Sequence, residues 1–350
     1  MDKPSDKGYP LVVPGYFGLR PGIQIGTQLR ASASEEQMQS VRALGAEWVM
    51  TGLPPKQHTL DSYLALKRRF EAQGLKIYRL ANDSCHNMEE VTLNLPGRDA
   101  KIEEYLRYIR LLGKAGIHYS TYAHMGNGIW SSAPEQVRGG ARARALRLDK
   151  DPVGSWGGKR WRGPLSHGRR YTEEELWDNY TYFIRKVVPV AEESHVWIGV
   201  HPDDPPVYDL GGIPRCIFGT FAGYQKALEI AGSPNVGVCL CVGCWLEGGK
   251  GMGGDVLEAI RYFTARKKLF KVHLRNISAP LPEGFVETFL DDGYMSMYRV
   301  IKTLHDSGFT GAVISDHVPA MDGGREAAEA FSLGYINALI RAARGQENQS

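Results

Sequence analysis

The fold is decided by four stretches in the second half of the chain, VWIGVHP (196–202), VGVCLCVG (236–243), FKVHLRN (270–276) and GAVISDH (311–317). Each has the length and the apolar content of a buried strand, and each carries a histidine, cysteine or aspartate at or near its C-terminal end. Segments with helical spacing separate them. Buried apolar strands that alternate with helices predict an α/β fold built on a parallel sheet.

Four similar stretches precede these along the chain, namely GIQIGTQ (22–28), AEWVMTG (46–52), KIYRLAN (76–82) and HYSTYAH (118–124). Eight strand–helix units in succession predict a (β/α)8 TIM barrel, and we expect residues 1–350 to form this one domain. A doubly wound open sheet is the alternative that the alternation by itself leaves open.

Local signals mark where the helices begin and end. Residues 97–115 and 294–307 carry apolar side chains at helical spacing. The sequences Ser34-Glu-Glu-Gln37 and Thr172-Glu-Glu-Glu175 are typical of capping boxes at helix starts. Glycines that can adopt the left-handed conformation are predicted to end four helices: Gly45, Gly74, Gly116 and Gly308.

Residues 126–170 interrupt the alternation with nine glycines, eight arginines and no sustained period. The segment follows the fourth strand, so we expect an extended basic loop on the catalytic face of the barrel. It is interpreted either as a lid whose arginines attract an anionic substrate or as a surface insertion that packs against solvent or another subunit.

Composition excludes several classes of protein. The chain has 350 residues, 43% of them hydrophobic and 23% charged, and a net charge of +3, which predicts an ordinary globular protein without a nucleic-acid partner. No apolar stretch approaches the roughly 18 residues of a membrane span, so no membrane partner is expected. Residues 1–18 lack the apolar core of a signal peptide, and the five cysteines do not form a disulfide framework. A cytoplasmic location is therefore predicted.

The four stretches quoted first end near His201, Cys241, His273 and Asp316. If these strands are parallel neighbours in one barrel, the four side chains converge at its mouth. Two imidazoles, a thiolate and a carboxylate are together the ligands of a divalent metal. This mixture of nitrogen, sulfur and oxygen ligands matches the intermediate softness of Zn²⁺, and it can also bind Mn²⁺ or Fe²⁺.

Two neighbouring sequences refine this prediction. Cys239 and Cys241 point to the same face of one strand, so only the cysteine nearer the mouth reaches the site, which favours Cys241. The prolines of His201-Pro-Asp-Asp-Pro-Pro206 stiffen the turn after the strand. We expect them to hold His201 and the adjacent carboxylates on a rigid rim, with Asp203 as a candidate substrate-binding residue.

At these residues the chain resembles the mannonate dehydratase family of xylose-isomerase-like metal barrels. The resemblance is strongest in LPGRD (95–99), LWDNYTYFIRKVVPVAEE (176–193), VHPDDPP (200–206), CVGC (241–244), VHLRN (272–276) and SDH (315–317). It implies that His201, Cys241, His273 and Asp316 hold a catalytic divalent ion, Mn²⁺ before Fe²⁺ or Zn²⁺. It also implies that His317 transfers a proton, and that the protein is a homo-oligomer, a dimer or tetramer.

The family reaction is the loss of water from D-mannonate, a small sugar acid, which gives 2-dehydro-3-deoxy-D-gluconate. Such a reaction needs a Lewis acid for the developing enediolate charge, a base for the C2 proton and an acid for the departing C3 hydroxyl. Arg275 is a candidate to bind the substrate carboxylate in bidentate fashion; a structural salt bridge at the barrel rim is its alternative role.

The chain departs from the family pattern on the substrate side. A tyrosine that completes the acid–base pair in the family is replaced in AEAFSLGY (328–335) by Ala330 or Phe331. Where the family has Asp-Trp-Thr-Arg, this chain has Ile-Trp-Ser-Ser (129–132), which keeps Trp130 as a candidate substrate contact. Candidate catalytic substitutes for the lost tyrosine are Tyr122, His124 and Tyr335. The sequence thus predicts a kept metal site and leaves open a substrate other than mannonate.

Two rival functions remain at this point. A metal-dependent isomerase or epimerase would move a proton between neighbouring carbons on the same barrel without losing water. A non-catalytic metal- or carbohydrate-binding relative would keep the ligands for stability and would close the coordination sphere.

Overall fold

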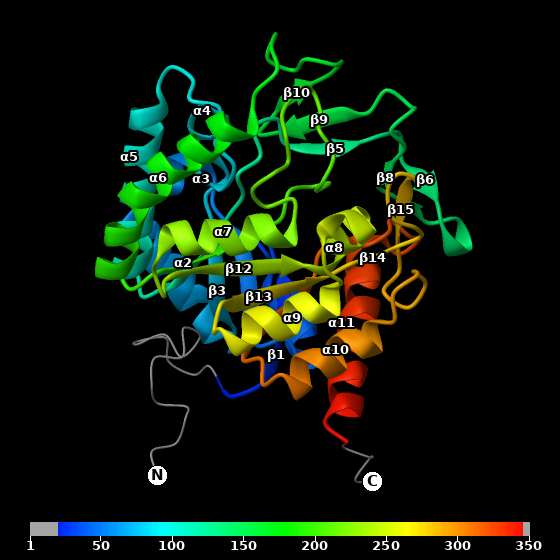
Figure 1. Cartoon of the computed structure of the whole chain (residues 1–350). Helices are drawn as coiled ribbons and strands as arrows, with labels where there is room; N and C mark the ends of the chain where they lie inside the picture. The colour runs from blue at the N-terminus through cyan, green and yellow to red at the C-terminus, as the bar shows by residue number, and fades with distance from the viewer. Residues whose placement is uncertain (1–19, 346–350) are drawn as a thin grey trace.

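A computed structural model describes residues 20–345 of the chain (Figure 1). The stretch 1–18, on which the expected absence of a signal peptide rests, lies outside the described residues. The central sheet has eight parallel strands in the order β3-β2-β1-β16-β13-β12-β11-β4. Their bounds are β1 Ile23–Gln28, β2 Trp48–Gly52, β3 Lys76–Ala81, β4 Tyr119–Tyr122, β11 Trp197–Val200, β12 Val236–Cys241, β13 Leu269–Leu274 and β16 Gly311–Ser315.

The pairing of the first strand with the last decides between the two predicted topologies. Ile23 in β1 is the register partner of Gly311 in β16, so the sheet curls back on itself. A doubly wound sheet is open, and its first strand does not pair with its last. The predicted TIM barrel is confirmed, and all eight predicted strand stretches contain a barrel strand.

One seam of the barrel is closed by side chains in place of a strand ladder. Between β3 and β4 the hydroxyl of Tyr108 donates to the carbonyl of Leu80 at 2.6 Å and contacts Ser120 Oγ at 3.3 Å. Just above, the amide of Ala123 donates to the carbonyl of His86 at 2.8 Å. These contacts satisfy polar groups that a ladder would otherwise pair.

The strand β3 carries one extra residue opposite β2. Ile77 is the register partner of Val49 and Arg79 that of Met50, so Tyr78 has no partner across the ladder. An extra residue of this kind is a β-bulge, which changes the direction of the following side chain.

The helices pack around the barrel, with apolar faces where the sequence predicts them. Residues 97–115 contain a helix that buries Ile102 and Ile109, and 294–307 contain one that buries Val300 and Leu304. Both capping boxes form, and the four predicted glycines have positive φ.

None of the helices in residues 20–345 has the length and apolar content that crossing a bilayer requires. Their bounds are α1 Glu35–Ala43, α2 Leu60–Ala72, α3 Asp83–His86, α4 Glu89–Thr92, α5 Arg98–Lys114, α6 Glu173–Glu193, α7 Phe221–Ala231, α8 Val242–Gly248, α9 Val256–Ala265, α10 Met297–Asp306 and α11 Gly324–Ala343, with short 3₁₀ turns at Pro55–Gln57, Arg138–Gly140 and Gly249–Met252.

The segment 126–170, expected as a loop without a period, contains short antiparallel strands. One three-stranded sheet runs β10-β9-β5, and another joins the segment to the later chain in the order β14-β15-β8 (Figure 1). The strands of these sheets are two to four residues long, too short to give a sequence period. Their bounds are β5 Ile129–Ser131, β6 Glu135–Gln136, β7 Arg142–Ala143, β8 Ala145–Leu146, β9 Val153–Trp156, β10 Lys159–Trp161, β14 Asn276–Ile277 and β15 Phe285–Thr288.

Candidate metal centre

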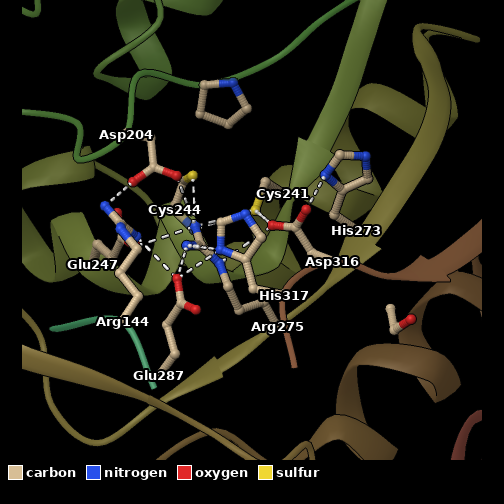
Figure 2. A network of polar contacts seen from close by, with 12 residues as sticks. Arg144, Asp204, Cys241, Cys244, Glu247, His273, Arg275, Glu287, Asp316 and His317 are labelled. Atoms are coloured by element: carbon tan, nitrogen blue, oxygen red, sulfur yellow. Dashed lines mark hydrogen bonds and ion pairs between the residues drawn. The ribbon is translucent and has the colours of Figure 1, made fainter. Parts of the chain in front are cut away.

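The side chains of His201, Cys241, His273 and Asp316 meet at the carboxyl ends of β11, β12, β13 and β16. One potential ligand atom of each residue lies within 4.8 Å of those of the other three. Figure 2 shows Cys241, His273 and Asp316 turned toward one another. The structure therefore brings together the four residues that the sequence predicts as ligands.

His201 presents one defined ring nitrogen to this group. Its Nδ1 lies 2.8 Å from the carbonyl oxygen of Pro202. Because a carbonyl can only accept, Nδ1 carries a proton, which leaves Nε2 as the nitrogen that can bind a metal once it is unprotonated. This hydrogen bond from the second nitrogen is the usual way in which a metal-binding histidine is oriented. Burial acts to lower the pKa of His201, but the neighbouring Cys241 outweighs it and raises this pKa.

His273 supplies a buried atom that needs a partner. Its Nδ1 has no hydrogen bond within residues 20–345 and lies 3.2 Å from Asp316 Oδ1. Its Nε2 lies 3.5 Å from the Sγ atom of Cys239. A buried nitrogen without a hydrogen bond is costly unless a ligand completes it. Cys239, one layer deeper in the barrel than Cys241, contacts the far side of this ring.

The Cys241 sulfur is suited to a cation. Burial by itself would raise the pKa of this thiol, but Cys244 and the Arg275 guanidinium together hold its pKa well below the usual range. The amide of Cys244 donates to Sγ at 3.5 Å. Thiolate, carboxylate and imidazole together fit a divalent metal by donor type. The residues present therefore fit the ion that the ligand pattern predicts.

Beside the ligands lies an ion network that we name the arginine–carboxylate cluster (Figure 2). Arg275 reaches Glu247 at 3.1 Å and Asp204 at 3.3 Å, and Arg144 reaches Glu247 at 3.1 Å. All of these side chains are buried or nearly so. The cluster consists of Arg144, Asp204, Glu247, Arg275 and Glu287.

This cluster decides between the two predicted roles of Arg275. The residue is fully buried, and its guanidinium is shared among Asp204, Glu247 and Glu287. Its Nη2 also lies 2.9 Å from Cys244 Sγ. The structural salt bridge is thus the arrangement that the structure shows, because no face of the guanidinium is open to a substrate. The ligand-like atoms of Asp204, Cys244 and Glu247 also lie close together, and the same arginine cation neutralises them.

His317 stands at the edge of the site with its side chain 40% exposed. Its Nδ1 lies 2.8 Å from Glu287 Oε1. Burial acts to lower the pKa of His317, but the carboxylates of Glu287 and Asp316 outweigh it and raise this pKa to about 9. Of the residues predicted to transfer protons, this one combines contact with the ligand group and access to solvent.

The side chains of Tyr122 and His124 contact each other and are not among the side chains that meet with the four candidate ligands. The Tyr122 hydroxyl lies 2.5 Å from His124 Nδ1. The His124 ring is enclosed by Phe183, Tyr180 and Phe218. Burial lowers the pKa of His124 to about 3, so its ring is neutral at physiological pH. This aromatic enclosure does not support the predicted catalytic role of either residue.

Two further predicted contacts are occupied by the protein itself. Asp203 is buried and paired with Arg215 at 3.3 Å. Trp130 is buried in β5, and its indole nitrogen donates to Asn127 Oδ1 at 3.1 Å. Neither side chain is free to bind a substrate in the way expected from the sequence.

Two residues of the site were missed by sequence reasoning. Glu287 lies in GFVETFL (284–290), where a single carboxylate in an apolar stretch is a signal of a paired, buried charge. Arg144 lies in the alternating ARARAL (141–146), which marks a short strand with one charged face. Both patterns are local, so neither predicts which distant residue forms the ion pair.

The comparisons with known proteins agree with this geometry. The sequence profile of the D-mannonate dehydratase (UxuA) family matches residues 32–344. The chain belongs to the D-mannonate dehydratase family. It is 30% identical over 275 residues to mannonate dehydratase 2 of Halalkalibacterium halodurans, which covers 73% of this chain and 78% of the relative. Members of the D-mannonate dehydratase family are hydro-lyases, and this chain is an enzyme of that class.

Solved structures support the same assignment. The crystal structure of mannonate dehydratase from Streptococcus suis superimposes with a TM-score of 0.79 at 26% identity, over 94% of this chain and 97% of the other. A xylose isomerase domain protein from Planctomyces limnophilus matches with a TM-score of 0.61 at 14% identity, over 93% of this chain and all of the other, and shows the fold alone. The D-mannonate dehydratase family thus shares the xylose-isomerase-like barrel found here.

The position of the family tyrosine falls in α11. Ala330 lines a cavity of about 1300 Å³ that is bounded by α1, α2, α11 and the strands β1, β2 and β3. Phe331 is 37% exposed and stacks on Tyr335, with ring centroids 6.2 Å apart, and the edge of Phe289 also contacts it. Tyr335 therefore faces Phe331 and does not line this cavity, as expected for a residue farther round the helix.

Proposed function

We propose that this hydro-lyase removes water from a sugar acid, with D-mannonate as the first substrate. The observation that carries the proposal is the placement of His317, a half-exposed proton carrier, directly beside four convergent metal ligands. A binding protein that kept a metal for stability would have no use for a titratable group at the open edge of its site. Family membership supplies the reaction class.

The proposed metal is held by His201, Cys241, His273 and Asp316, with Mn²⁺ ahead of Fe²⁺ and Zn²⁺. A divalent ion bound there supplies a Lewis acid that neutralises charge developing on the substrate carboxylate and its neighbouring hydroxyl. The Asp316 carboxylate and the Cys241 thiolate bring negative charge to the site, and His201 offers Nε2 as a donor atom because its Nδ1 is held by the Pro202 carbonyl. This charge balance suits a dication.

His317 is proposed to move a proton at its Nε2 atom. Its Nδ1 is held by Glu287, so Nε2 is the nitrogen that remains for exchange with substrate. In the dehydration, the C2–H bond breaks as its electron pair forms the C2–C3 double bond, and the C3–O bond breaks. The hydroxyl leaves as water after taking up a proton, and the resulting enol becomes the 2-keto acid. His317 carries one of these two proton transfers.

The decisive experiment is turnover of D-mannonate by protein loaded with Mn²⁺, followed by detection of an α-keto acid that has lost the mass of water. We expect His317→Ala to lower kcat by about 10²- to 10⁴-fold without loss of bound metal. His305→Ala, which removes an exposed histidine of α10, is the matched control and is expected to keep full activity.

Two outcomes would contradict the proposal. A product of unchanged mass would indicate an isomerase or epimerase acting on the same site. Tightly bound metal together with no turnover of D-mannonate or of related sugar acids would indicate a binding protein.

A further inference from the structure

Arg79 is a partly buried arginine at the barrel mouth that makes no ion pair within residues 20–345. Arg144 and Arg275 are shared among the carboxylates of the cluster, and Arg215 is paired with Asp203. Arg79 in β3 differs, because no carboxylate within residues 20–345 lies within ion-pair distance of it. Its Nε is buried without a hydrogen bond, and its Nη2 has one contact, 3.0 Å from His86 Nδ1.

His86 does not compensate this charge. Burial, with Arg79 as the next cause, holds the pKa of His86 well below its ordinary value, so the ring is neutral. Its Nδ1 also lies 2.9 Å from the carbonyl of Thr121. One nitrogen cannot donate to that carbonyl and accept from Arg79 at the same time. A guanidinium remains charged in any protein environment, and a partly buried one without an anion is costly.

The bulge in β3 gives Arg79 its position. Because Tyr78 is the extra residue, Arg79 stands in register with Met50, and Met50 stands in register with Gln28 of β1. The Gln28 amide donates at 2.8 Å to the backbone carbonyl of the ligand Asp316. Gln28, Met50 and Arg79 all line the cavity of about 1300 Å³. Arg79 therefore lines the same cavity as Gln28, whose side chain is bonded to the backbone of Asp316.

The other charged groups of this cavity are already engaged or lie at its rim. Glu329 accepts from Thr27 and Ser315, and Glu326 accepts from Gln37. Exposed charged residues at the rim are Arg30, Asp83 and Arg325, and Arg69 donates to the carbonyls of Ala31 and Ala33. Lys271, deeper in the barrel, faces Cys239 across the β12–β13 ladder. Arg79 is the inner cation left for an external anion.

We propose that Arg79 binds the carboxylate of the substrate, a role for which the sequence made Arg275 one candidate. The inference rests on the proposed function, since it supposes an acidic substrate at the metal centre. A planar guanidinium matches a carboxylate through two parallel N–H···O bonds, which fixes both the position and the rotation of the acid. Selectivity for acids over neutral polyols then depends on this one residue.

The test measures binding apart from turnover. D-mannonate is titrated into Mn²⁺-loaded His317→Asn protein by calorimetry, with and without Arg79→Gln. We expect Arg79→Gln to raise the Kd about 10- to 100-fold, the usual effect of losing a charge-assisted bidentate contact. Arg79→Lys keeps the charge and is expected to show a smaller loss. Arg30→Gln removes a charge from the rim of the same cavity and is expected to change the Kd less than about twofold.

A neutral ligand separates recognition of the carboxylate from general damage. D-mannitol is expected to bind the proteins with and without Arg79→Gln equally. Unchanged affinity of Arg79→Gln for D-mannonate, or equal losses for D-mannonate and D-mannitol, would overturn the inference, as would a His317→Asn protein that binds no D-mannonate.

Failure of the proposed function gives a different result. Wild-type protein that binds D-mannonate in an Arg79-dependent way but releases no keto acid would overturn the reaction and support the assignment of Arg79. Normal turnover of D-mannonate by Arg79→Gln with an unchanged KM would support the reaction and overturn the assignment of Arg79.

Discussion

Nδ1 of His317 lies 2.8 Å from Oε1 of Glu287, and the two residues differ sharply in exposure. The His317 side chain is 40% exposed, whereas that of Glu287 is 3% exposed and is held by Arg144 and Arg275. A fixed, buried anion therefore orients an imidazole that solvent can reach. Under the proposed function, Glu287 is a positioning residue that acts through His317.

Removal of the Glu287 charge is expected to change both rate and pH dependence. For Glu287→Gln we expect kcat to fall about 10- to 100-fold with metal content unchanged, because His317 loses its orientation. Since the Glu287 carboxylate raises the pKa of His317, the limb of the pH–rate profile that reports His317 is expected to move to lower pH.

The control is Glu283→Gln, a glutamate at an exposed position of the same segment, which is expected to leave kcat and the profile unchanged. A Glu287→Gln protein with lower kcat but an unshifted pH profile would mean that Glu287 has only a structural role.

The two cysteines of β12 provide a matched pair for the metal site. Cys241→Ala removes a proposed ligand, so the affinity for Mn²⁺ is expected to fall by more than about 100-fold. Cys239→Ala removes contacts behind the candidate ligands, among them the one with His273 Nε2, and is expected to cost about 10-fold or less. Metal content after dialysis against a weak chelator distinguishes the two. Equal losses would contradict the assignment of Cys241 as the ligand.

Arg144 is expected to stabilise the fold by anchoring the 126–170 segment in the barrel. Arg144→Gln leaves Asp204, Glu247 and Glu287 with one arginine in place of two, and the free energy of unfolding is expected to fall by about 3–5 kcal/mol. Arg138→Gln breaks an exposed pair with Asp291 in the same segment and is expected to cost less than about 1 kcal/mol. Urea unfolding of both variants tests this, and similar losses would argue against the anchoring role.

His124 is expected to make the protein sensitive to acid. Its pKa is lowered to about 3 in the folded state by burial, against about 6.5 in an unfolded chain. Between these values the unfolded chain binds a proton that the folded protein does not. The stability is therefore complete above pH 6.5 and is lost as pH falls, by about 2 kcal/mol at pH 5.

His124→Phe keeps a ring among Phe183, Tyr180 and Phe218 and removes this titration. The difference in unfolding free energy between pH 7.5 and pH 5 is expected to be about 2 kcal/mol smaller in this variant than in wild type. Equal pH dependence in both proteins would show that His124 is not the acid-sensitive group.

The sequence predicts the barrel and the ligand set because both depend on local patterns. Each strand is an apolar run bounded by residues that end strands or begin helices, and the candidate ligands His201, Cys241, His273 and Asp316 stand at or next to the ends of those runs. Parallel strands in one barrel then force the convergence without any knowledge of side-chain contacts.

The roles of individual charges depend on distant partners and were not predictable in this way. Arg275 is saturated by carboxylates at positions 204, 247 and 287, which only the folded chain brings together. The enclosure of His124 depends on Phe183 and Phe218 in the same manner. A sequence pattern predicts the type of a residue and the strand that carries it. Whether that residue is still free to bind a ligand depends on its neighbours in the folded chain.

The bulge at Tyr78 has a consequence for how this enzyme could acquire a new substrate. One additional residue in β3 shifts the pairing of everything after it, while the buried Ile77 keeps its place opposite Val49. A single codon inserted or deleted at such a point exchanges the side chain presented to the mouth without disturbing the apolar interior. A change at this point of β3 can thus alter substrate preference while the apolar core, and with it the ability to fold, stays the same. An alignment that assumes strict alternation of inward-facing and outward-facing residues along β3 would place Arg79 one position out of register.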